Sequence, residues 1–183
     1  MSLNRRMLYI PIFHIDANLI NARQKLAEVN QLERWAEDDV ILINMSSTAL
    51  AEARADRNAS RVAKAAKQIF TTTPTATEVD PLFKQVEAAL FPGGTKDDNQ
   101  RNDVKIVCDA AKYQAILVTG DGASKTQPGG ILGNRDKLRG IVEIFSPAEA
   151  VAFVRAKIRE RDEFNERYVT EVGGVLPPWT GKD

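Results

Sequence analysis

The sequence has a single cysteine, no long apolar run and no excess of either charge. With only Cys108 among its 183 residues, an internal disulfide bond is excluded. The 25 Lys and Arg residues balance 25 Asp and Glu residues, so the net charge gives no general attraction to nucleic acids or membranes. No apolar stretch approaches the roughly 20 residues of a membrane span, and the segment MSLNRRMLYI lacks the features of a secretory signal. We therefore expect a cytoplasmic protein that does not enter a membrane.

Length and composition are those of one folded domain. Hydrophobic residues make up 43% of the chain, which is enough for one proper core but not for two domains of ordinary size. We expect a single domain over residues 1–168 and an irregular tail over residues 169–183. Trp179 in this tail is expected to dock on the domain or on a neighbouring subunit.

Short apolar runs alternate with helical patterns along the chain. The expected strands are residues 12–16 and the runs VILINM, AILVT and IVEIF. The expected helices cover residues 19–37, 47–70 and 103–114, one that starts at Asp80 and Pro81, and a last one that starts at the capping box SPAE. This alternation predicts an α/β fold with a central, mostly parallel sheet between two layers of helices.

Two acidic residues fall on helix faces that should point toward the sheet. On the helix expected from Ser47, a rotation of 100° per residue places Glu52 on the apolar stripe that includes Ala55, Ala59 and Val62. The same construction places Asp103 at the inward N-terminal end of its helix. The charged residues expected on solvent-facing surfaces are Arg54, Arg57, Arg61, Lys64, Asp97, Asp98 and Asp109.

Two further acids stand at the ends of expected strands. Asp16 closes the run IFHI, and Asp121 follows AILVTG. In open parallel sheets, ligand sites form beyond the carboxyl ends of the strands, so Asp16, Glu52, Asp103 and Asp121 can meet at one edge. Two carboxylates about 4 Å apart repel by about 4 kcal/mol at an effective dielectric constant of about 20. Protons or a cation must offset this repulsion, and all-oxygen ligands favour Mg²⁺ or Mn²⁺ over zinc.

The order of these acids resembles the PIN-domain ribonucleases. HIDANLI is similar to the opening strand and Asp-x-Asn motif of that family, which assigns Asp16 and Asn18. STALAEAR supplies the helix acid of the family as Glu52. DVKIVCDAAKYQAILVTGDG is similar to a segment that ends in Thr-x-Asp. This segment assigns Asp103, Thr119 and Asp121.

The resemblance implies an endoribonuclease that hydrolyses RNA phosphodiester bonds with Mg²⁺ or Mn²⁺. Asp16, Asp103 and Asp121 would be metal ligands, and Glu52 would bind a second ion or orient the attacking water. Asn18 and Thr119 would hydrogen-bond a phosphate or a water molecule beside the metal. The expected substrate is single-stranded RNA. A protein inhibitor and a homodimer are both compatible with the family.

The segment after Asp121, GASKTQPGGILGNRDKLRG, joins five glycines to basic residues. It could cradle backbone phosphates next to the metal site, and a solvated loop is the alternative interpretation. The basic residues of this RNA-binding hypothesis are Lys125, Arg135, Lys137 and Arg139.

Two residues with reactive side chains, His14 and Cys108, are expected to have structural roles. His14 shares a strand with Asp16 but is expected in the core rather than on a metal, and Cys108 is expected to pack on the flank of a helix. For the whole chain, one alternative is a PIN-like domain without catalysis that binds RNA or a protein. Another is a small phosphatase, but this would need an Asp-x-Asp motif where the chain has Asp16-Ala17-Asn18.

Overall fold

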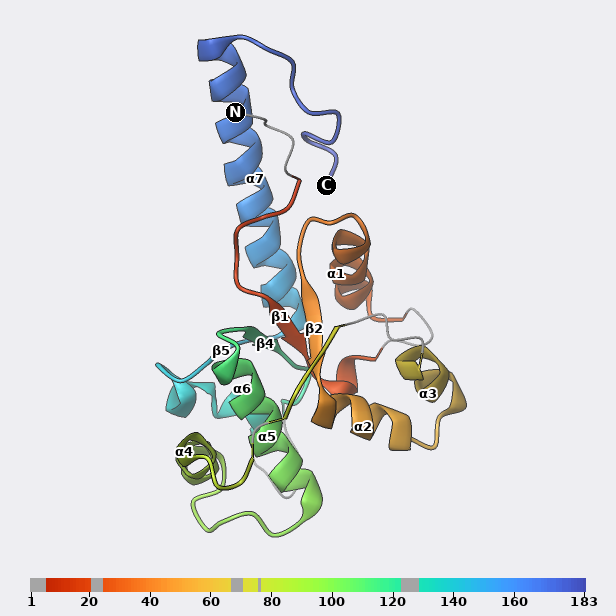
Figure 1. The fold of residues 1–183 in the computed structure, drawn as a ribbon, viewed down its shortest axis with the longest axis vertical. Coiled ribbons are helices and arrows are strands. Elements are labelled where there is room, and N and C mark those ends of the chain that lie inside the picture. Colours follow the sequence, from red (N-terminus) through yellow and green to blue (C-terminus); the bar gives the residue numbers. More distant parts are fainter. Residues whose placement is uncertain (1–5, 21–24, 67–70, 76, 123–128) are drawn as a thin grey trace.

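The computed structural model describes residues 6–20, 25–66, 71–75, 77–122 and 129–183. Within these residues, five parallel strands form one sheet in the order β3-β2-β1-β4-β5 (Figure 1). The strands are β1 (Phe13–Ile15), β2 (Ile43–Ser46), β3 (Thr71–Thr73), β4 (Ile116–Val118) and β5 (Glu143–Phe145). Because β1 connects to β2 on one side and β4 lies on its other side, the strand order reverses between β1 and β4.

Helices flank this sheet, which gives the three-layer α/β fold expected from the sequence. The helices of the described residues are α1 (Ala27–Glu37), α2 (Ser47–Ala55), α3 (Ala59–Ala66), α4 (Pro81–Leu90), α5 (Asp98–Lys112), α6 (Gly130–Gly133) and α7 (Pro147–Val172), with short 3-10 helices η1 (Ala17–Leu19) and η2 (Arg135–Leu138). Helix α1 packs against α7, and α5 packs against α2 and α4. No helix in the described ranges is long and apolar enough to cross a membrane.

The four predicted strands correspond to β1, β2, β4 and β5, while β3 was not predicted. Strand β3 consists of three threonines and pairs only with β2, at the edge of the sheet. Two of its three residues are exposed. An edge strand of this kind needs no apolar run, so periodicity alone gives no signal for it.

The prediction of one helix over residues 47–70 was wrong in the described part of that range. The chain leaves α2 at Ala55 and re-enters helix at Ala59, where the Asn58 side chain accepts a hydrogen bond from the Ser60 N–H at 3.1 Å. Ala55 and Ala59 are exposed, so the predicted apolar stripe does not continue across the break. The last residues of the predicted helix, 67–70, lie outside the described residues.

Helix boundaries elsewhere follow the capping residues. Asp80 caps α4 as predicted, and its side chain accepts from the Leu82 N–H at 2.9 Å. Helix α7 begins with the predicted capping box of Ser146 and Glu149. Helix α5 starts five residues earlier than predicted because Asp97 is its N-cap. Helix α1 begins at Ala27 rather than residue 19.

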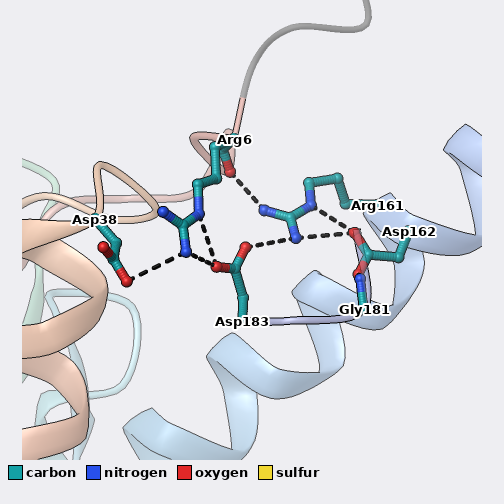
Figure 2. A network of polar contacts seen from close by, with 6 residues as sticks. All are labelled: Arg6, Asp38, Arg161, Asp162, Gly181 and Asp183. Carbon is teal, nitrogen blue, oxygen red and sulfur yellow. Dashed lines mark hydrogen bonds and ion pairs between the residues drawn. The ribbon is translucent and has the colours of Figure 1, made fainter. Parts of the chain in front are cut away.

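The C-terminal tail folds back beside α7, which extends well past the sheet (Figure 1). The Arg161 guanidinium lies 4.3 Å from the ring centre of Trp179, so the tryptophan docks on its own domain. The Asp183 carboxylate accepts hydrogen bonds from Arg6 and Arg161, and the Asp162 carboxylate accepts from the Gly181 N–H at 2.8 Å (Figure 2). The C-terminal tail is thus held against Arg6, at the start of the described residues, and against α7.

Candidate active site

Asp16 directly follows the central strand β1 and is 6% exposed. Its Oδ2 accepts hydrogen bonds from the Thr119 hydroxyl at 2.6 Å and the Asn18 amide at 2.8 Å. Burial raises the pKa of Asp16, and the hydrogen bond from Thr119 opposes this rise. Thr119 directly follows β4, which pairs with β1. Residues that follow two neighbouring strands therefore hold this carboxylate in place.

Asp121 lies beyond β4 and is held by the backbone of α6. Its backbone N–H donates to the Thr119 hydroxyl at 3.0 Å, and its Oδ2 accepts from the Ile131 N–H at 2.8 Å. Gly130 has a φ of +54°, and a Cβ there would lie 2.6 Å from both carboxylate oxygens of Asp121. In the described part of the glycine-rich segment, Gly130 and Ile131 therefore lie against the Asp121 carboxylate.

Glu52 reaches the same region from α2, where it is partly buried. The Asn102 amide on α5 donates to its Oε1 at 2.8 Å. Burial raises the pKa of Glu52, the hydrogen bond from Asn102 opposes this, and the charge of Asp16 adds to the rise. Asn102 was not among the predicted site residues. Its position beside Asp103, on the inward side of the helix, could have indicated that it lies near the acids.

Asp103 lies close enough to the other acids for their charges to affect its pKa. Burial raises its pKa to about 8, and the negative charges of Asp16, Asp121, Glu52 and Asp97 add to the effect. The four predicted acids therefore share one electrostatic environment. Such a raised pKa is common where an acidic group faces a ligand site.

The four acids line one cavity of about 700 Å³, which we call the acid pocket. They come from the ends of β1 and β4 and from α2 and α5, as the reversal of strand order between β1 and β4 predicts. Asn18 also lines the pocket, whereas Thr119 is fully buried beneath Asp16. Thr119 therefore positions Asp16 and does not itself reach a phosphate.

Three of the charged residues predicted to face solvent do not do so. Arg61 lines the acid pocket, pairs with Asp56 and donates from Nη2 to the Ala17 carbonyl at 2.5 Å. The break between α2 and α3 turns this arginine away from the direction that one continuous helix would give it. The Lys64 side chain is only 10% exposed and pairs with Glu33, and Asp109 is fully buried and accepts from the Thr75 hydroxyl at 3.1 Å. Asp97 lines the acid pocket but is exposed, as predicted.

The described basic residues of the RNA-binding hypothesis do not line the acid pocket. Arg135 pairs with Glu149, Arg139 pairs with Asp136, and Lys137 donates to the Asn134 side chain. Arg135 and Arg139 line a separate cavity of about 680 Å³ along β5. Among its described lining residues, none is shared with the acid pocket. Lys125 lies outside the described residues.

The carboxylate oxygens of the acid pocket are of the type that Mg²⁺ and Mn²⁺ prefer. In the described ranges, however, no three His, Cys, Asp or Glu side chains are already grouped closely enough to hold one ion. The donor chemistry fits a hard divalent cation, and binding would have to draw the carboxylates together. His14 lies in the core as predicted, 1% exposed, and burial lowers its pKa to about 4. A hydrogen bond to its ring was also expected, but neither ring nitrogen has a hydrogen-bond partner within the described residues.

Compared with known proteins, the sequence matches no family profile and no curated protein. Solved structures are similar, among them the following three. A DNA-bound VapBC from Salmonella typhimurium is 16% identical with a TM-score of 0.51, over 75% of this chain and 99% of that chain. VapBC2 from Rickettsia felis, bound to a promoter DNA fragment, is 17% identical with a TM-score of 0.49, over 74% and 98%. FitAB bound to an IR36 DNA fragment is 18% identical with a TM-score of 0.48, over 74% and 95%.

At these identities the similarity concerns the fold, and of the three the Salmonella typhimurium structure carries the argument. That match spans nearly the whole of the other chain, whose architecture is a PIN domain. The parallel five-stranded sheet and its flanking helices agree with the match. The chain therefore has the PIN-domain fold.

Proposed function

We propose that the protein is a divalent-metal-dependent endoribonuclease that hydrolyses RNA phosphodiester bonds at the acid pocket. The observation that carries this proposal is that four carboxylates from four separate elements line one cavity. Such a set of like charges is unfavourable unless protons or cations offset it. The position of the pocket, where the strand order reverses, is the usual ligand site of an open parallel sheet.

In this proposal, Asp16, Asp103 and Asp121 hold the metal, and Glu52 binds a second ion or orients the attacking water. Bound Mg²⁺ or Mn²⁺ would lower the pKa of water and stabilise negative charge that develops on phosphorus. The neutral residues of the site position the acids. Thr119 and Asn18 hold Asp16, Asn102 holds Glu52, and the Ile131 N–H holds Asp121.

Calorimetric titration of Mn²⁺ into the wild-type protein and into Asp103→Asn tests the metal site. A fluorescent single-stranded RNA added to the same samples tests cleavage. We expect both metal binding and cleavage in the wild type and a strong loss of both in Asp103→Asn. Asp98→Asn is the matched control, because Asp98 lies on the same helix but is exposed and pairs with Arg101.

A DNA oligomer of the same base sequence should be included, because the Salmonella typhimurium VapBC structure is bound to DNA. Preference for the DNA would make the protein a deoxyribonuclease instead. If the wild type binds Mn²⁺ but cuts neither strand, the acid pocket is a metal site without this activity.

The second candidate is a PIN-like module that binds RNA or a protein without catalysis. Its support is that, in the described part of the chain, the acids are not already grouped as a metal site. Absence of Mn²⁺ binding by the wild type would favour this candidate. The VapBC assembly makes a protein partner a reasonable second ligand to test.

A further inference from the structure

A second, shallower pocket adjoins the acid pocket across α2. Its volume is about 450 Å³, and it shares Glu52, Ala55 and Asn102 with the acid pocket. The remainder of its described lining includes the hydroxyl side chains of Ser47, Thr48 and Thr75, and we call it the hydroxyl pocket. The two pockets are therefore neighbours, and Glu52 lines both.

Each pocket contains one cationic side chain among its described lining residues. In the acid pocket this is Arg61, anchored to the Ala17 carbonyl and paired with Asp56. In the hydroxyl pocket it is Lys105, whose Nζ lies 3.0 Å from an oxygen of Glu78. The Glu78 side chain is 52% exposed, so this ion pair is weak and exchangeable. Each of the two pockets that Glu52 lines thus also has a cation in its described lining.

A polyanion that enters a depression rich in carboxylates meets strong repulsion unless cations contact its phosphates. Proteins that bind single strands follow the backbone with such positive groups. Arg61 can offer guanidinium N–H groups beyond those that its two present contacts use, because the group has five. Lys105 can exchange Glu78 for a phosphate oxygen.

We propose that one RNA strand crosses both pockets, with Arg61 and Lys105 each contacting a backbone phosphate on opposite sides of the acids. This inference rests on the proposed function, since it places the scissile bond above Glu52 and its neighbouring acids. Glu78 competes with the strand for Lys105. Removal of Glu78 and removal of Lys105 therefore change RNA affinity in opposite directions.

Fluorescence anisotropy of a labelled single-stranded RNA in Mg²⁺, over a series of KCl concentrations, tests this path. The full chain with Asp103→Asn is the background, so that the proposed reaction does not consume the probe. Lys105→Gln is expected to weaken binding several-fold and to reduce the magnitude of the salt slope by about 0.7, the value for one single-strand phosphate contact. Glu78→Gln is expected to strengthen binding.

Lys112→Gln is the matched control, because Lys112 is an exposed residue at the other end of the same helix. Arg61→Gln should resemble Lys105→Gln, and Arg61→Lys should recover part of the affinity because it restores the charge. Circular dichroism melts separate these effects from loss of folding, which Arg61→Gln risks by removing the bond to Ala17. The Glu78 variant carries less of this risk because its side chain is 52% exposed, and the melts also check Lys105→Gln, whose side chain is 23% exposed.

The path is overturned if Lys105→Gln binds RNA as Lys112→Gln does, or if the background protein binds no RNA at low salt. Cleavage by the wild type with normal RNA binding by the Lys105 and Arg61 variants would leave the nuclease and remove the path. Binding that depends on both residues, without cleavage by the wild type, would leave the path and remove the nuclease.

Discussion

At the scale of single residues, three of the four acids of the pocket, Asp16, Glu52 and Asp121, accept hydrogen bonds from neutral groups. Thr119 and Asn18 donate to Asp16, Asn102 donates to Glu52, and the backbone of the α6 turn donates to Asp121. Hydrogen bonds to charged groups stabilise by about 1.5–3 kcal/mol, so these donors hold the carboxylates at defined positions. The precision of the site therefore depends as much on uncharged residues as on the acids.

Gly130→Ala is predicted to damage the site through Asp121. A Cβ at this position would lie 2.6 Å from both Asp121 carboxylate oxygens, and the residue has a φ of +54°. We expect a loss of more than about 1 kcal/mol of folding stability in urea unfolding, together with weaker Mn²⁺ binding. The control is Gly133→Ala, because a Cβ there has no neighbour within 4 Å. Equal stability of the two variants would show that the turn tolerates a side chain.

Cys108 is predicted to be unreactive in the folded protein. It is fully buried, and burial raises its pKa to about 12. Because the thiolate is the reactive form, a thiol reagent such as DTNB at pH 8 should label the native protein very slowly. One equivalent should react in denaturant, since the chain has one cysteine. Rapid native labelling would mean that the core opens around α5.

At the scale of elements, the break between α2 and α3 has the largest effect on the site. The break lets Arg61 enter the acid pocket, which one straight helix over residues 47–70 would not allow. Asn58 supports the break because its side chain accepts from the Ser60 N–H at the start of α3. Asn and Asp at the start of a helix compete well for backbone N–H groups.

The capping box of α7 should make stability depend on pH in a defined window. Glu149 accepts from the Ser146 N–H at 2.8 Å, and this bond with the neighbouring Arg135 lowers its pKa from 4.5 to about 2. A carboxyl whose folded pKa is depressed stabilises the fold above pH 4.5, and this contribution disappears as the pH falls toward 2. Thermal melts should therefore show Glu149→Gln less stable than wild type at pH 7, with a smaller difference at pH 3. A constant difference would assign the loss to packing.

At the scale of the whole molecule, one polar network joins the two ends of the described chain to α7. Asp183 accepts from Arg6 and Arg161, Arg6 also pairs with Asp38, and the side chain of Asp183 is fully buried (Figure 2). The network and the Arg161–Trp179 contact support the part of α7 that extends past the sheet (Figure 1).

Asp183→Asn is predicted to destabilise the fold by about 1–3 kcal/mol, because it removes a buried negative charge that two partly buried guanidinium groups share. Arg6 and Arg161 would keep only Asp38 and Asp162 as carboxylate partners. Hydrogen exchange should become faster in the C-terminal half of α7 and around Arg6, while the sheet should be unaffected at the same pH. Glu171→Gln, an exposed change near the end of α7, serves as the control. Unchanged exchange in Asp183→Asn would show that the tail is held mainly by Trp179.

Local sequence features were enough to predict the α/β alternation, the four strands with apolar runs and the capped starts of α4 and α7. They also predicted that the acids Asp16, Glu52, Asp103 and Asp121 lie near one another. Each of these follows from local periodicity, from capping chemistry or from the order of residues along the chain. The roles of the acids remain proposals, but their placement along one cavity agrees with the prediction.

Which side chains meet the acids depends on how the elements pack. Arg61, Asp97 and Asn102 reach the acid pocket because the helix break and the early start of α5 reorient them. The turn at Gly130 closes on Asp121, and the basic residues after it pair with nearby acids instead. Contacts between residues distant in sequence depend on how elements pack, and neither residue spacing nor helical periodicity specifies that packing.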